Sequence, residues 1–361
     1  MTLSWKLFAA LCFTSVSLLT WAGEPRRVDD LMPRTVTFPT NEVMLDRALA
    51  ELHKQTGNVV EVRRGNASNL KLKLPNKSGT FWETLDSIGK QSKLGIDTYQ
   101  LDGGVALVDR SYRELRTDYN GIFRFAVKRV DLFKDEETQV HQCHVTLDAA
   151  WEPRFKALYV NLDHASAVFG KQRETMERES QGDVAGKCAT YVVLRMKAPE
   201  RAAAKIDSLK GAIRVIGVPT MLEFALANLQ KDKVVVQEGV KVGLTDVKKR
   251  TANLWTVDLL TQYPDGAIVA LESFQQTWRD GNRVWLSWGI DPKTKKPYEL
   301  EPSSRGEPQD SSTGTKIQYH FTPRGQTPLP SAGTEVTLRY RTPNRVVAVT
   351  VPFSFQDLPL P

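Results

Sequence analysis

The stretch from residue 36 to residue 110 contains one apolar pattern twice, 36 residues apart, and this repeat restricts the fold more than any other feature of the chain. The segment Val36-Thr37-Phe38-Pro39 corresponds to Leu72-Lys73-Leu74-Pro75. The same offset relates two sets of apolar positions at helical spacing: Leu45, Leu49 and Leu52, and Phe81, Leu85 and Ile88. An alternating strand, a proline and an apolar stripe therefore recur without a gap, which predicts a repeated β-α unit.

Residues at the ends of these segments support the same elements. Gly57 is suited to end the first helix, and Thr80 with Glu83 three residues later forms a capping box for the second. Asp102-Gly103 between two apolar runs is typical of a hairpin turn. The predicted order is β-α-β followed by β-α-β-β, in a small domain over residues 35–112.

The second helix carries a resemblance to a known type of domain. The run Phe81-Trp82-Glu83-Thr84-Leu85-Asp86, with the hairpin that continues through Val108, resembles the short N-terminal domain of secretins and TonB-dependent transducers. This resemblance implies a small docking domain on a protein of the cell envelope. No secretin channel region follows it, so the resemblance does not extend to a transport role.

The first 22 residues have the features of a cleavable export signal. Lys6 is the only charge before an apolar run over residues 7–22, and small residues at Thr20 and Ala22 suit a signal peptidase. We expect an exported protein of the periplasm, envelope or extracellular space, with an uncleaved anchor as the alternative. Residues 23–34 are polar and predict a flexible linker. No later apolar stretch reaches membrane length, so we expect no stable transmembrane span after cleavage.

From Gly121 onward the pattern changes to β-strands separated by turns. Strand spacing and β-branched content predict two β-sandwich domains, over residues 119–230 and 231–361. Residues 293–314 are poor in apolar side chains and predict a surface loop. The predicted fold class is therefore α+β: a small duplicated β-α-β domain followed by an all-β sandwich region.

Charge and motifs argue against several kinds of function. The net charge of +7 is spread over the chain, which does not suit a nucleic-acid-binding surface. The sequence has no nucleophile elbow, zinc-protease helix, phosphate-binding glycine loop or calcium loop. His141 and Cys143 share a strand face whereas His144 takes the other, so no metal site is predicted. We expect no catalytic residue, no metal and no cofactor, although a catalytic triad that meets only in the fold leaves an unrecognised hydrolase as an alternative.

Two cysteines remain after signal cleavage, Cys143 and Cys188. Each alternates with apolar residues, so both side chains point toward a core. In an oxidising compartment such a pair predicts a disulfide bond. The alternative is two buried thiols that do not meet.

A cluster of aromatic residues provides the candidate ligand-binding site. A hairpin turn over residues 279–283 places Phe274, Trp278 and Trp285 on one strand face, and apolar residues including Val284 and Leu286 on the other. If the second face is the core side, the three aromatics form an exposed platform for sugar rings or a partner protein. The alternative is that another element covers them.

These patterns together favour an exported, non-enzymatic envelope protein that recognises other proteins through its docking domain and sandwich modules. A free sheet edge in the small domain would suit strand addition by a partner. The alternatives are a polysaccharide-binding protein that uses the aromatic face, and an unrecognised hydrolase.

Overall fold

A computed structural model describes residues 31–361 except 65–69, 75–77, 101–102, 138, 177–178, 200–202, 252, 269–278, 280–281, 312–313, 325–326, 328 and 332. Two helices and 24 strands lie in this described part, so the chain is mostly β and the predicted α+β class is wrong. The reason is that the strands extend over nearly all of the chain after residue 94, whereas both helices lie before it. Neither helix is long and apolar enough to cross a membrane.

The N-terminal unit contains both helices. Its elements are β1 (Glu42–Met44), α1 (Leu45–Thr56), β2 (Val60–Arg63), β3 (Lys71–Lys73), α2 (Phe81–Ser92), β4 (Leu94–Asp97) and β5 (Val105–Ser111). Strands β1 and β3 form an antiparallel pair, while β2, β5 and β4 form a second sheet in that order. A β-α-β unit needs the strands before and after its helix in one sheet. Because β1 and β2 lie in different sheets, the predicted duplicated β-α-β domain is not formed.

The 36-residue offset nevertheless relates equivalent hydrogen bonds. The Gln55 side chain donates to the carbonyl oxygen of Thr37 at 2.8 Å and accepts from its N–H at 3.0 Å. Gln91 does the same to Lys73, with both distances at 2.6 Å. Each helix is therefore tied at its C-terminal end to a preceding extended segment by the same pair of bonds.

A proximal β-sandwich follows the N-terminal unit. Its strands are β6 (Thr117–Asn120), β7 (Phe123–Lys134), β8 (His141–Trp151), β9 (Lys156–Phe169), β10 (Gln172–Met176), β11 (Glu179–Asp183), β12 (Ala189–Lys197), β13 (Lys205–Val218) and β24 (Val347–Pro359). One sheet has the order β10-β9-β13-β24, with β11 also on β9, and the other has the order β12-β8-β7-β6. Side chains from both sheets, including Phe125 and Phe353, fill the core between them.

The last strand returns to the proximal sandwich, although the sequence placed it in the second one. β24 pairs with β13 along its whole length, from Val347 opposite Gly217 to Pro359 opposite Lys205. Its alternate residues Val351, Phe353 and Phe355 are buried in the proximal core. The second sandwich therefore does not extend to residue 361.

The distal sandwich is inserted between β13 and β24. Its strands are β14 (Met221–Ala227), β15 (Val234–Gln237), β16 (Val240–Thr251), β17 (Leu254–Gln262), β18 (Arg283–Trp288), β19 (Tyr298–Leu300), β20 (Ser304–Arg305), β21 (Gln309–Ser311), β22 (Gly314–Phe321) and β23 (Val336–Pro343). The sheets are β14-β23-β18-β19 and β15-β16-β17-β22-β20, with β21 also on β22. They enclose a core of their own. Three short strands lie within the predicted surface loop over residues 293–314.

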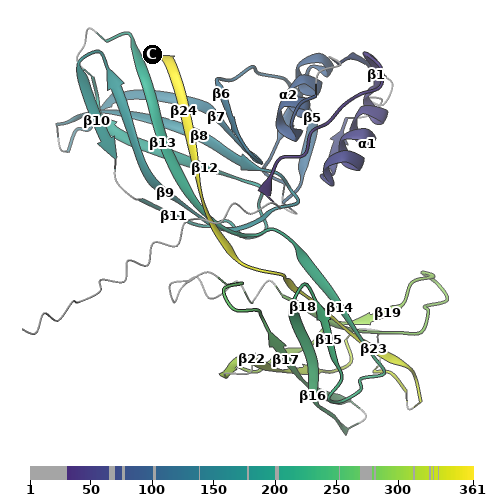
Figure 1. The fold of residues 1–361 in the computed structure, drawn as a ribbon. Helices are drawn as coiled ribbons and strands as arrows, with labels where there is room; N and C mark the ends of the chain where they lie inside the picture. The colour runs from purple at the N-terminus through teal and green to yellow at the C-terminus, as the bar shows by residue number, and fades with distance from the viewer. Residues whose placement is uncertain are drawn as a thin grey trace, which may run out of the picture.

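Two chain segments connect the proximal and distal sandwiches, and each runs nearly straight from one sandwich into the other (Figure 1). β13 continues into β14, and β23 continues into β24. The N–H of Asn344 donates to the carbonyl oxygen of Thr220 at 3.0 Å where the two segments pass. Ile216, Val218 and Val346 form a small apolar cluster there. A hydrogen-bonded and packed double connection is stiffer than a single flexible linker.

Candidate functional site

A buried ion pair holds the N-terminal unit on the proximal sandwich. Asp86 on α2 accepts two hydrogen bonds from the Arg124 guanidinium on β7, at 2.8 and 3.0 Å, and both side chains are at most 10% exposed. The hydroxyls of Tyr112 and Tyr119 donate to the same carboxylate at 3.2 and 2.6 Å. Burial, followed by the Asp86 charge, raises the pKa of Tyr112 to about 12 and also raises that of Tyr119. Both tyrosines are therefore protonated donors at neutral pH.

A second set of contacts lies at the end of α1. The Asn58 side chain donates to Glu152 at 2.8 Å and accepts from the N–H of Arg154 at 2.9 Å. The Arg154 guanidinium also donates to Glu152, at 2.6 Å. From α2, the Trp82 indole N–H donates to the carbonyl oxygen of Ile122 at 3.0 Å. Contacts from both helices fix the orientation of the unit on the sandwich.

A concave site, here called the junction pocket, lies between the two units and has a volume of about 290 Å³. Four of the residues that line it are cationic and one is acidic: Arg110, Arg113, Arg124, Lys128 and Asp148. Arg110 and Arg113 come from β5 and the segment after it, whereas the others come from β7 and β8. Cations from both units therefore surround one space.

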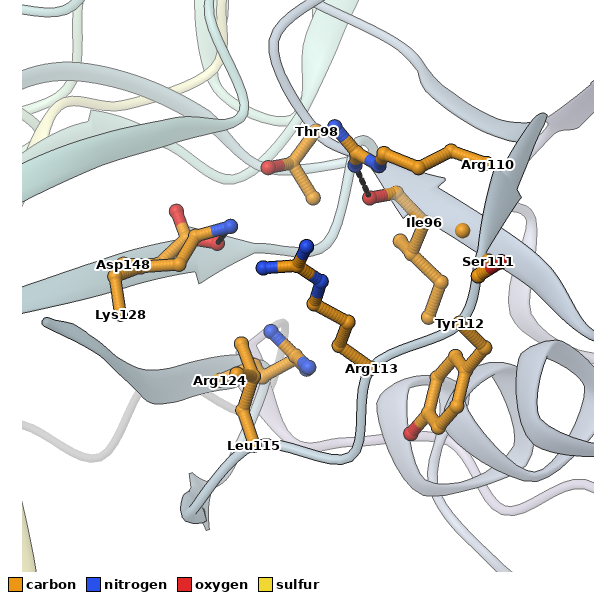
Figure 2. Close-up of a pocket in the computed structure, with 11 residues that line it drawn as sticks. Ile96, Thr98, Arg110, Ser111, Tyr112, Arg113, Leu115, Arg124, Lys128 and Asp148 are labelled. Atoms are coloured by element: carbon orange, nitrogen blue, oxygen red, sulfur yellow. Dashed lines mark hydrogen bonds and ion pairs between the residues drawn. The ribbon is translucent and has the colours of Figure 1, made fainter.

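Most of these charged groups already have a protein partner. Arg110 donates to the carbonyl oxygen of Ile96 at 3.0 Å, and Lys128 lies 3.7 Å from Asp148. Arg113 is exposed and has no hydrogen-bond or ion-pair partner within the described part of the chain. Figure 2 shows its guanidinium pointing into the space between Arg124, Asp148 and Ile96. Arg113 is therefore placed to receive an anion.

Two tyrosines lie beside the pocket. The rings of Tyr99 and Tyr191 stack with centroids 4.8 Å apart, and the residues are 39% and 47% exposed. Tyr99 donates to Asp148 at 2.7 Å, and Tyr191 lies directly opposite Asp148 in the β8–β12 register. Burial, and then the charge of Asp148, raises the pKa of Tyr99. An apolar, partly exposed surface thus adjoins the cations.

A different feature of the N-terminal unit is the outer edge of β2. This strand pairs with β5 on one side and, among the described residues, with no strand on the other. Val59 and Val62 are 58% and 37% exposed there. The distal sandwich has a similar edge at β15, where Val234 and Val236 are 54% and 56% exposed. An edge strand has unpaired backbone groups that a further strand can bind.

The predicted aromatic platform is not present at Trp285. Trp285 is only 5% exposed, and the Arg283 guanidinium lies 4.6 Å from the ring centroid. Val284 and Leu286 do face the distal core, as expected. Phe274 and Trp278 lie outside the described residues. The strand-face assignment is confirmed only for Val284 and Leu286. Trp285 is covered, which is the alternative to an exposed platform.

The predicted disulfide is also wrong, because no disulfide bond joins Cys143 and Cys188, and both are buried. Cys143 lies opposite Met196, near the end of β12, whereas Cys188 lies just before Ala189, where β12 begins. The Cys188 thiol donates to the carbonyl oxygens of Thr98 and Gly104 at 3.1 and 3.0 Å. The two side chains face the core as expected, but from opposite ends of one pair of strands.

Sequence reasoning missed the junction pocket, although a local signal was present. Arg110, Arg113 and Arg116 are spaced three residues apart just after the predicted hairpin. The described residues contain no group of three or more His, Cys, Asp or Glu side chains that could hold a metal ion. No family model matches the chain, and no curated protein matches it either.

Proposed function

We propose that the protein is an exported, non-enzymatic envelope component that recognises another protein by strand addition at the outer edge of β2. One observation carries this proposal: among the described residues β2 ends its sheet, and Val62 on this strand and Val59 just before it are exposed beside the unpaired backbone edge. A bound strand would gain backbone hydrogen bonds from the edge and apolar contacts from the valines.

The fixed orientation of the N-terminal unit on the proximal sandwich supports this proposal. Buried contacts through Asp86 and Glu152 hold the unit in one orientation. The β2 edge therefore loses little conformational entropy when a partner strand binds. The resemblance to the docking domain of secretins and TonB-dependent transducers favours the same use.

The two alternative functions receive less support. Polysaccharide binding was predicted to use three exposed aromatic residues, and one of them, Trp285, is buried. A hydrolase needs a nucleophile with a general base in a concave site. The described residues that line the junction pocket include Ser111 but no histidine that could act as its general base.

The test is capture from a native envelope extract with matched edge variants. The double substitution Val59→Lys and Val62→Lys places charges beside the β2 edge, which disfavours strand addition. The control places the same charges on the β15 edge through Val234→Lys and Val236→Lys. We expect the wild type and the β15 variant to capture the same protein and the β2 variant to lose it. Binding of that purified partner should then slow hydrogen exchange at the backbone amides of residues 60–63 that point away from β5.

Two results would contradict the proposal. Equal capture by the β2 variant and the wild type would place the interaction elsewhere on the molecule. Loss of capture in the β15 variant alone would assign the strand addition to the distal sandwich.

A further inference from the structure

We propose that the junction pocket binds a carboxylate-bearing sugar of the uronic acid class, with Arg113 as the principal ligand of the carboxylate. This site is separate from the β2 edge, so the inference does not depend on the proposed function.

The charge balance favours an anion. Two carboxylates, Asp86 and Asp148, accompany four cations in and behind the pocket wall, which leaves an excess of two positive charges. Asp86 fixes the Arg124 guanidinium, and the carbonyl oxygen of Ile96 fixes that of Arg110. The Arg124 and Arg110 side chains are thus oriented before a ligand binds, which lowers the entropy cost of binding. The planar Arg113 guanidinium can bind a carboxylate through two parallel hydrogen bonds.

Asp148 narrows the ligand class. It lies in the pocket wall, accepts a hydrogen bond from Tyr99, and its charge repels any nearby anion. A ligand with both a carboxylate and hydroxyl groups can offset this repulsion, because one hydroxyl can donate to the remaining acceptor positions of Asp148 while the carboxylate pairs with Arg113. This requirement favours a sugar acid over phosphate or sulfate.

The volume of the junction pocket and the tyrosines beside it also fit a uronic acid. A volume of about 290 Å³ lies just below the range of about 300–1,000 Å³ for drug-sized ligand sites, which suits a single sugar unit. Tyr99 and Tyr191 present partly exposed rings next to Asp148. Aromatic rings supply apolar area for the carbon face of a sugar.

The experiment is isothermal titration of the full mature chain with sodium galacturonate, compared with galactose, sodium acetate and sodium sulfate at equal ionic strength. Binding of galacturonate should exceed that of the other three. Arg113→Gln should weaken it by about tenfold or more, because a hydrogen bond to a charged group contributes about 1.5–3 kcal/mol. Tyr191→Ala should weaken it by about fivefold through loss of aromatic contact.

Arg116→Gln is the matched control, because Arg116 is an exposed arginine on the same segment but does not line the pocket. We expect its affinity for galacturonate to equal that of the wild type. Arg113 is exposed, so its substitution should leave the unfolding temperature unchanged, which separates loss of binding from loss of folding. No binding by the wild type, or equal affinity in Arg113→Gln, would overturn the inference. Equal affinity for acetate or sulfate would overturn the assignment to a sugar acid, and equal weakening by Arg116→Gln would indicate a diffuse basic surface.

Discussion

At the scale of single residues, Asp86 joins the N-terminal unit to the proximal sandwich by accepting four hydrogen bonds from three side chains. The sequence predicted the helix that carries Asp86, and the structure contains both hydrogen bonds of the Thr80–Glu83 capping box at its start. It did not predict Arg124 as the partner, because that residue is 38 positions away and comes close only in the folded chain. Local hydrogen bonds are encoded by neighbouring residues, whereas buried ion pairs depend on how units dock.

Replacement of Asp86 by Ala should reduce the free energy of unfolding by about 3–5 kcal/mol, because Arg124 would remain buried without a counter-charge. Urea denaturation followed by circular dichroism measures this change. The control is Asp46→Ala on α1, where the carboxylate is exposed and near the helix start. Its loss should cost less than about 1 kcal/mol. Equal effects of the two substitutions would show that the Asp86 pair contributes little.

At the scale of elements, the strands β8 and β12 show which properties of a sheet can be predicted from sequence and which cannot. The alternation of apolar residues predicted correctly that Cys143 and Cys188 face a core. The pairing register places them at opposite ends, and register depends on the partner strand as well as on the local pattern. The same limit explains β24, whose apolar alternation predicted a strand but not that β13 is its partner.

The two thiols give a prediction at this scale. In a folded chain that begins at Gly23, neither should react with a maleimide at neutral pH, because both are buried and burial raises the pKa of the Cys143 thiol to about 11. After denaturation without reductant, intact-mass spectrometry should show two labels. A denatured chain that accepts labels only after reduction would instead indicate a disulfide bond.

At the scale of the whole molecule, the distal sandwich is an insertion between two strands of the proximal one. The sequence predicted two sandwiches from strand spacing, but it could not predict that the chain returns to the first, since no local residue marks the partner of the last strand. The junction pocket is only partly visible in the sequence. Its four cations lie within residues 110–128, but they surround one space only because the N-terminal unit docks on the proximal sandwich.

The insertion predicts which excised fragment folds. Residues 221–343 contain both distal sheets and their core, so this fragment should show β-rich circular dichroism and one cooperative thermal transition. Residues 231–361 lack β14 and contain β24 without its partner β13. That fragment should expose the buried face of β24, including Phe353 and Phe355, and aggregate. If residues 231–361 instead gave the sharper and more reversible transition, the distal sandwich would be independent of β14, and β24 would have a partner within it.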